Sequence, residues 1–220
     1  MGIISLEKIN CLFWLGRYSE RVFTTLKAFG QYYDKMIDYD ADAYKEFCAA
    51  LNIPDIYLYK EDFIYRYLFE KENPDSICSN MNRAFDNAVI LRDEITSETL
   101  AYIQMALDVM KVNHQATAPV LALLPVLDYL YAFWGSVEDN VLNDEARYIM
   151  KCGRYIERLD LYLRLNFQDR EIAKECSRLK NRLQKTKIAL DKEAEEKTME
   201  LIAEKNYREA LDYLNRILPC

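Results

Sequence analysis

The sequence predicts an all-α protein, a single-domain helical bundle with long antiparallel helices. Three observations favour this class. The chain has only five glycines and five prolines among its 220 residues, and 51% of all residues are hydrophobic. No two segments of alternating polar and apolar residues are joined by a hairpin turn. A chain of this length suits one domain with a sizeable core.

The first helix is predicted from Ser5 to about Ile37. No proline interrupts this stretch, and apolar residues such as Leu12, Leu15 and Phe23 recur three or four positions apart. That spacing places them on one face of a helix. A long helix with a buried face is therefore expected at the start of the chain.

Capping residues and prolines indicate where the later helices begin. Asn-Pro-Asp at 73–75, Thr-Ser at 96–97 and Asn-Asp at 143–144 are typical of helix starts. We predict further helices over 42–51, 60–70, 73–95, 96–113, 117–135 and 143–166. The tyrosine-rich segment 60–70 also has the composition of a strand, but its helical neighbours favour a helix.

The last quarter of the chain is polar and is predicted to be helical, with a break near Asn206. Residues 191–220 form a polar C-terminal helical extension of a single domain that spans 1–220. The final segment carries Leu211, Leu214, Ile217 and Leu218 at helical spacing. It is expected to close the bundle or to dock a partner.

A six-residue pattern, Gly-Arg-Tyr-x-Glu-Arg, occurs twice, at 16–21 and at 153–158. When the second copy is projected as a helix, Gly153, Glu157, Asp160 and Arg164 lie in one stripe with apolar residues on both flanks. In the first copy Gly16, Glu20, Phe23 and Lys27 share the corresponding stripe. Both stripes are therefore expected to point into the bundle.

The residue types of this motif suggest how the two helices meet. Gly16 and Gly153 lack a Cβ and would allow another helix to approach closely. Glu20 and Glu157 need donors when buried. Each could pair with the arginine three residues before it, Arg17 or Arg154, or with the opposite copy in a pseudo-twofold arrangement.

Two roles remain open for this cluster. It could be a purely structural network that fixes helix packing. It could also form a pocket in which Glu20 and Glu157 act as acid or base, while arginines hold an anion and Asn87 adds an amide. An anion held between Arg21, Arg92 and Arg158 would support the pocket.

Other chemistries have weaker signals. The chain has no GxxxxGK loop, no GxSxG turn, no CxxC pair and no Glu-x-x-His pair, so neither a metal site nor a cofactor is expected. His114 is the only histidine and is expected at the surface. Cys152 precedes Gly153 and is expected to be an inert buried thiol.

Charge and hydropathy indicate the compartment. The net charge of −7 argues against general nucleic-acid binding. The first residues do not have the apolar pattern of a signal peptide, so none is expected. The most apolar stretch contains Pro119, Pro125 and Asp128, and its uncharged part is shorter than the ~20 residues of a membrane span. A reduced, soluble, cytoplasmic protein with no membrane contact is expected.

These motifs, together with "DNAVILRDEITSE" and "DEARYIMKCGRYIERLD", resemble the bacterial alpha-E family, which is named for its helical character and its E-R motif. The similarity covers about two thirds of the chain. The family pattern falls on Gly16, Arg17, Tyr18, Glu20, Arg21, Asn87, Ala88, Arg92, Ser97, Glu98, Asp144, Glu145, Gly153, Arg154, Glu157, Arg158 and Asp160. The chain departs from it at Val89, Leu100 and Asn143 and is shorter than typical members.

The resemblance implies a functional context. Such proteins look like companions of ATP-grasp-type amide ligases, transglutaminase-like peptidases and sometimes Ntn-type hydrolases in bacteria. The implied role is an accessory or ligand-binding component of peptide synthesis or modification, with a protein partner and an anionic small molecule or peptide as ligand. The alternatives are an enzyme that acts on an amide or acyl phosphate, and a structural scaffold.

Overall fold

The computed structural model of the protein describes residues 4–218, and within that range it contains helices and no strand. The all-α prediction is thus confirmed. In chain order the helices are α1 (Leu6–Asp38), α2 (Ala43–Leu51), α3 (Lys60–Phe69), α4 (Ile77–Ile90), α5 (Arg92–Ile95), α6 (Ser97–Val112), α7 (Pro119–Ala122), α8 (Leu124–Asn140), α9 (Asp144–Arg164), α10 (Asp169–Leu183), α11 (Lys192–Ala203) and α12 (Tyr207–Leu214).

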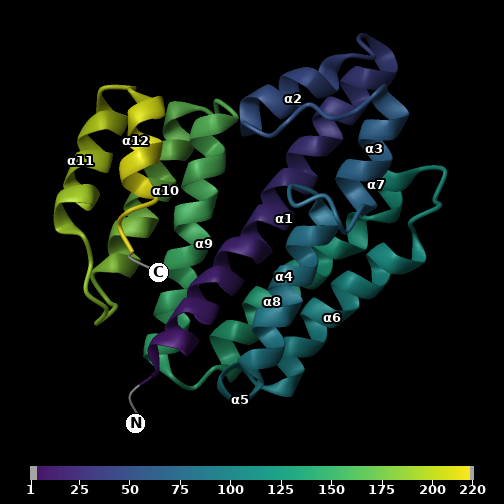
Figure 1. Cartoon of the computed structure of the whole chain (residues 1–220). Helices are drawn as coiled ribbons and strands as arrows, with labels where there is room; N and C mark the ends of the chain where they lie inside the picture. Colours follow the sequence, from purple (N-terminus) through teal and green to yellow (C-terminus); the bar gives the residue numbers. More distant parts are fainter. Residues whose placement is uncertain (1–3, 219–220) are drawn as a thin grey trace.

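Helix α1 is the central element of the bundle. Ser5 caps it, because the Ser5 hydroxyl accepts a hydrogen bond from the backbone N–H of Lys8 at 3.3 Å. Leu12, Leu15 and Phe29 are fully buried along it. The helix packs against α4 on one side and α9 on the other (Figure 1), so it joins the two halves of the molecule.

The six longest helices alternate in direction along the chain. Figure 1 shows α1 running upward, α4 downward, α6 upward, α8 downward, α9 upward and α10 downward. Successive helices are therefore antiparallel, as the sequence predicts. Because an even number of reversals separates α1 from α9, these two helices run in the same direction where they pack together.

The tyrosine-rich segment forms α3, and its helical assignment is confirmed. Phe63 and Tyr67 are four residues apart, so both face α1, and their rings stack with centroids 5.3 Å apart. Phe29 of α1 stacks on Tyr67 at 5.8 Å. This aromatic cluster fixes the upper end of α1, where α2 and α3 meet it.

One predicted helix start is wrong. The helix expected from residue 73 begins at Ile77, because Ser76 is its cap and accepts a hydrogen bond from the backbone N–H of Ser79 at 2.9 Å. Asn73 instead closes a turn by accepting from the N–H of Asp75 at 3.1 Å. An Asx turn competes with capping for the same residue type.

Two helix ends also differ from prediction. The helix expected to reach Ile95 breaks at Leu91, which separates α4 from α5. The apolar helix breaks at Leu123 and then continues to Asn140 instead of ending near Gly135. A glycine inside a helix costs only about 1 kcal/mol, and buried Val137 outweighs it here.

The helices after α9 cover it from one side. Helix α10 packs directly on α9, and α12 contacts it from the same side (Figure 1). Leu214, Ile217 and Leu218 are buried, and the N–H of Asp191 donates to the carbonyl of Ile217 at 3.0 Å. The last helix and the residues that follow it therefore close the bundle.

The apolar segment needs a correction. By length and composition alone, the helical stretch 119–140 is long and apolar enough to cross a membrane, contrary to the sequence argument. In its most apolar window 39% is buried, and Val126, Leu130 and Phe133 contribute to the core. Core helices of soluble proteins pass the same length test, so solubility stays a proposal.

Candidate ligand-binding site at the crossing of α1 and α9

The two motif glycines lie where α1 and α9 cross. A Cβ built on Gly16 would overlap the carbonyl oxygen of Met150 and lie 3.0 Å from its carbonyl carbon. A Cβ on Gly153 would meet the carbonyl group of Phe13 in the same way. Backbone faces backbone at both points, which is the close approach that the sequence predicts.

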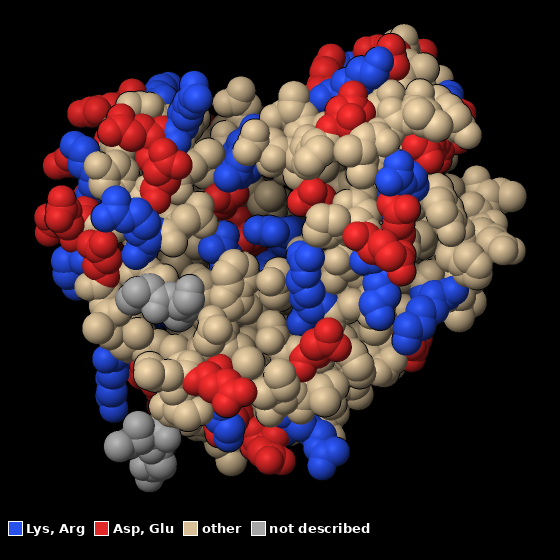
Figure 2. Space-filling model, viewed as in Figure 1, with Lys and Arg blue, Asp and Glu red and all other residues tan. Residues whose placement is uncertain are grey.

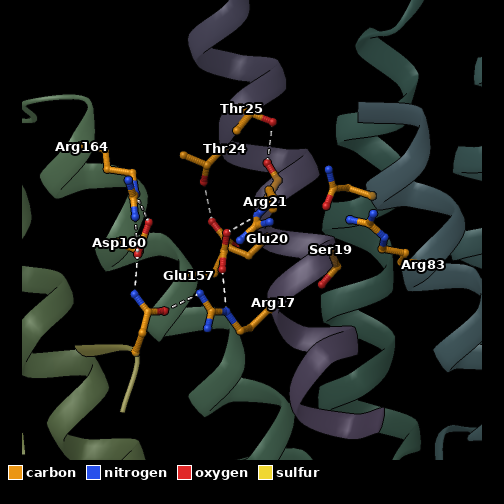
Figure 3. A network of polar contacts seen from close by, with 12 residues as sticks. Arg17, Ser19, Glu20, Arg21, Thr24, Thr25, Arg83, Glu157, Asp160 and Arg164 are labelled. Carbon is orange, nitrogen blue, oxygen red and sulfur yellow. Dashed lines mark hydrogen bonds and ion pairs between the residues drawn. The ribbon is translucent and has the colours of Figure 1, made fainter. Parts of the chain in front are cut away.

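Glu157 of the second motif binds arginines of the first. Arg17 Nε donates to Glu157 Oε2 at 2.6 Å, and Arg21 Nε donates to Oε1 at 2.5 Å (Figure 3). Both arginines come from α1, one turn apart, so they approach the carboxylate together.

Glu20 of the first motif binds arginines of the second. Arg158 forms a bidentate pair with it, through Nε and Nη2, at 2.7 Å each. Arg154 Nε donates to Glu20 Oε2 at 3.1 Å, and the Thr24 hydroxyl donates to Oε1 at 2.7 Å. Both carboxylate oxygens are therefore occupied by donors.

Of the two pairings left open by the sequence, the structure has the one between motifs. The ion pairs run across the crossing and not from an arginine to the glutamate three residues later in its own helix. The contacts of the two copies are reciprocal. The pseudo-twofold relation of the whole helices stays a prediction.

The network is buried, and its positive and negative charges balance. Glu20 and Glu157 are fully buried, and four arginines surround these two carboxylates. Asp160 and Glu175, both buried, supply further negative charge beside them. Buried ions need such partners because an uncompensated charge costs several kcal/mol.

The charge state of Glu157 follows from its neighbours. Burial alone would raise its pKa, but Arg17 and Arg21 lower the pKa from 4.5 to about 2. Arg21 and Arg158 have pKa values raised above their ordinary value, since the facing glutamates outweigh the effect of burial. Glu157 is therefore ionised throughout the physiological range.

This shift predicts a specific acid sensitivity. A carboxyl group whose pKa is lower in the folded protein than in the unfolded chain stabilises the folded state. For Glu157 this stabilisation is complete above the pKa of the unfolded chain, near 4.5, and is lost as the pH falls towards the folded pKa of about 2. For Glu157 the contribution is on the order of 3 kcal/mol. We expect the free energy of unfolding in urea to fall between pH 5 and pH 3 more steeply than in Glu157→Gln. Equal slopes would contradict the assignment.

A cavity of about 220 Å³ opens beside the Glu157 pair. Figure 2 shows the hollow between α2 and the C-terminal helices, with basic and acidic side chains meeting in it. We call it the mixed-charge cavity. Its polar lining consists of Arg17, Arg21, Thr25, Asn52, Tyr67, Asp75, Asn80, Glu157, Asp160, Arg164 and Asn215.

Asn215, from the segment after α12, bridges two charged residues that line this cavity, Arg17 and Asp160. Its Oδ1 accepts from Arg17 Nη2 at 2.8 Å, and its Nδ2 donates to Asp160 Oδ2 at 2.9 Å. Arg164 Nε donates to the other oxygen of Asp160 at 2.6 Å (Figure 3). The C-terminal extension thus completes the site.

Three of the predicted site residues lie elsewhere. Asn87 is half-buried on α4 and lines an open groove with Trp14. Arg92 and Glu98 are exposed on α5 and α6. The helix break at Leu91 turns α5 away, and α5 lies at the lower end of the molecule (Figure 1).

The anion site imagined between Arg21, Arg92 and Arg158 is therefore not formed. Arg21 lines the mixed-charge cavity, whereas Arg158 lines a separate cavity beside α10. The remaining predicted residues, Arg17, Glu20, Arg154, Glu157 and Asp160, do come together with these two arginines around the crossing.

Sequence reasoning missed several participants, among them Thr24, Asn80, Glu175 and Asn215. Thr24 follows Glu20 by one helical turn, so the i,i+4 spacing was a usable signal. The other three come from distant segments, and no local pattern marks them. Only the tertiary contacts of α4, α10 and the C-terminal segment reveal their roles.

Two of the cysteines have strongly raised thiol pKa values. Burial raises the pKa of Cys48 to about 12 and that of Cys176 to about 11, so both are poor nucleophiles at neutral pH. Cys220 lies outside the described residues. Within residues 4–218 no group of three or more His, Cys, Asp or Glu side chains is arranged to hold a metal ion.

Comparison with known proteins places the chain in a family. Residues 8–171 match the model of Alpha-E, described as a predicted alpha-helical domain with a conserved ER motif. Neither curated proteins nor solved structures gave a match. The match covers most of the chain and includes both copies of the motif, with the glutamate and arginine pairs that meet across α1 and α9. The chain therefore belongs to the Alpha-E family.

Proposed function

We propose that the protein is a ligand-binding accessory component of a bacterial peptide synthesis or modification system, and that the mixed-charge cavity holds a peptide-like ligand. The observation that carries this proposal is the lining of the cavity. Three arginines and three acids balance one another there, and amide side chains lie between them. A ligand with both charges and an amide bond matches that set.

The anionic end of such a ligand has donors available. Among the described residues, the two Nη atoms of Arg21 have no hydrogen-bond partner, because only Nε binds Glu157. The Arg21 side chain is 32% exposed, so it is accessible from the cavity. A guanidinium edge of this kind binds a carboxylate in a bidentate manner.

The amide and the cationic end also have partners. Asn80 Oδ1 is buried without a hydrogen-bond donor among the described residues, while its Nδ2 donates to the carbonyl of Ser76 at 2.7 Å. A buried acceptor without a partner is costly, and a ligand N–H would satisfy it. Asp75, half-buried at the rim, suits an ammonium group.

The alternative of an acid–base enzyme has less support. A carboxylate with a pKa of about 2, as in Glu157, is a weak base near neutral pH. Both oxygens of Glu20 already accept hydrogen bonds. Binding therefore fits the geometry better than catalysis by these two groups.

A purely structural role is the second candidate, and one observation favours it. Both buried glutamates are fully paired inside the protein, which is what a network that only fixes helix packing requires. The two roles make different predictions for a substitution of Arg164, which lines the cavity and is 24% exposed: only the binding role predicts a loss of ligand affinity.

Titration calorimetry with dipeptides tests the binding role. Alanyl-alanine with free ends is expected to bind, and capping either end by acetylation or amidation should weaken binding at least tenfold, because each cap removes one charge. Arg164→Gln should weaken binding similarly. Arg208→Gln is the matched control, since Arg208 is exposed and lies outside the cavity. Equal heats for capped and free peptides, or no binding at all, would leave the scaffold role.

The partner and compartment are further parts of the proposal. Family membership and the resemblance described above support a cytoplasmic protein that works with an ATP-grasp-type ligase or a transglutaminase-like protein. Co-expression with the ATP-grasp-type ligase of the same organism should give a complex that co-purifies. A ligase that purifies alone and forms unchanged product without this protein would contradict the accessory role.

A further inference from the structure

A second cavity, of about 240 Å³, lies on the Glu20 side of the crossing. It is lined by residues of α1, α8, α9 and α10, and we call it the cationic cavity. Its charged lining includes Lys27, Arg154, Arg158, Lys174, Glu175 and Arg178. Together with Glu171 in the lining and Glu20 behind it, three acids face five basic residues, so two positive charges remain.

This excess is unusual for its surroundings, because the whole chain has a net charge of −7. The mixed-charge cavity, by contrast, is lined by equal numbers of basic and acidic side chains. The same signature thus borders two cavities of different charge. The difference arises from residues outside the motif: Lys27 on α1, and Lys174 and Arg178 on α10.

Three of the basic side chains retain free donors. Among the described residues, Lys27 and Lys174 have no carboxylate within ion-pair distance, and Arg154 uses only its Nε. The Arg154 guanidinium lies over the Trp134 ring, with its carbon 4.2 Å from the ring centroid, a cation–π contact that helps to hold it in place. Lys27, Arg154 and Lys174 come from three different helices and therefore approach the cavity from three directions.

Arg154 is the arginine of the motif whose charge is least compensated. Burial lowers its pKa below the ordinary value, Glu20 opposes this effect, and the neighbouring Arg158 adds to the lowering. An additional anion beside Arg154 would restore the balance.

Glu175 limits which anion fits. It is buried, Arg178 donates to its Oε1 at 2.8 Å, and Arg158 lies 3.7 Å from its Oε2. That Oε2 has no hydrogen-bond partner among the described residues. A ligand here needs a hydroxyl or amine donor beside its negative charge.

We propose that the cationic cavity binds a phosphate-class dianion, which Lys27, Arg154 and Lys174 hold from three sides while Glu175 Oε2 accepts a hydrogen bond from a protonated oxygen of the same ligand. Two charges on the ligand match the two uncompensated positive charges. Ammonium and guanidinium donors converging from several directions suit a tetrahedral oxyanion. The site is independent of a peptide ligand in the mixed-charge cavity.

Titration calorimetry in a low-salt chloride buffer tests this site with three probes: inorganic phosphate, glycerol 3-phosphate and malonate. Phosphate is expected to bind, and glycerol 3-phosphate shows whether a monoester is also accepted. Malonate, a planar-ended dianion without a donor, should bind at least tenfold more weakly. Malonate binding equal to that of phosphate would overturn the phosphate assignment.

The double variant Lys27→Met/Lys174→Met removes two exposed side chains that form no ion pair among the described residues, so it should unfold at the same temperature as the natural protein. We expect it to lose phosphate affinity at least tenfold. The matched control is Lys71→Met/Lys180→Met, which makes the same charge change on exposed lysines outside the cavity. Equal losses in both variants, unchanged binding in the first, or no phosphate binding by the natural protein would each refute the site.

Discussion

Gly16→Ala and Gly153→Ala are each expected to destabilise the protein by more than about 4 kcal/mol, a large part of the roughly 5–15 kcal/mol that stabilises a typical domain. The new Cβ would overlap a backbone carbonyl, of Met150 in one case and of Phe13 in the other. Because both neighbours are backbone atoms of long helices, relief requires α1 and α9 to separate. That separation would stretch all four ion pairs at the crossing. Urea unfolding followed by circular dichroism measures the effect.

Gly135→Ala is the matched control for this prediction. Gly135 lies inside α8, and nothing lies within 4 Å of the place where its Cβ would be. Alanine favours a helix over glycine, so we expect a gain of about 0.5–1 kcal/mol. If Gly16→Ala were as well tolerated as Gly135→Ala, the two helices would not cross as described.

Glu20→Gln should have the second largest effect, a loss of about 3–5 kcal/mol in the free energy of unfolding. The amide keeps the shape of the side chain but removes its charge. Arg154 and Arg158 would then lose their shared counter-ion in a buried place. The amide nitrogen would also replace an oxygen that accepts two hydrogen bonds. Hydrogen-bond donors would then face each other at that position.

Asp169→Asn provides the comparison for Glu20→Gln. Asp169 pairs with Lys205 at 2.6 Å, but both side chains are about two thirds exposed. Solvent screens such a pair, so its loss should lower the free energy of unfolding far less than the loss of the Glu20 charge. Similar losses in the two variants would mean that the buried network contributes no more than a surface ion pair.

The helices and the crossing could be predicted from local signals. Apolar spacing identified α1, and the repeated motif identified two helices with a glycine, a glutamate and arginines on one buried stripe. What the sequence left open was the partner of each glutamate. Arginines three residues before it and arginines on another helix are both within reach on geometric grounds, and only the direction and closeness of the two helices decide between them.

The composition of the site could not be predicted to the same extent. Asn87, Arg92 and Glu98 match the family pattern but lie away from the crossing, because a shared pattern does not specify where a side chain lies. Asn80 and Asn215 reach the mixed-charge cavity from a distant helix and from the chain end. Such residues carry no periodicity or spacing that relates them to the motif.

The family match ends before several residues that line the two cavities. The match ends at residue 171, yet Lys174, Glu175 and Arg178 form one side of the cationic cavity, and Asn215 spans the floor of the other. If both proposed sites bind ligands, relatives that share the signature but differ after α9 should differ in which ligands they bind, because residues after α9 line both cavities. A fragment cut at residue 171 would preserve the signature while removing residues that line both proposed sites.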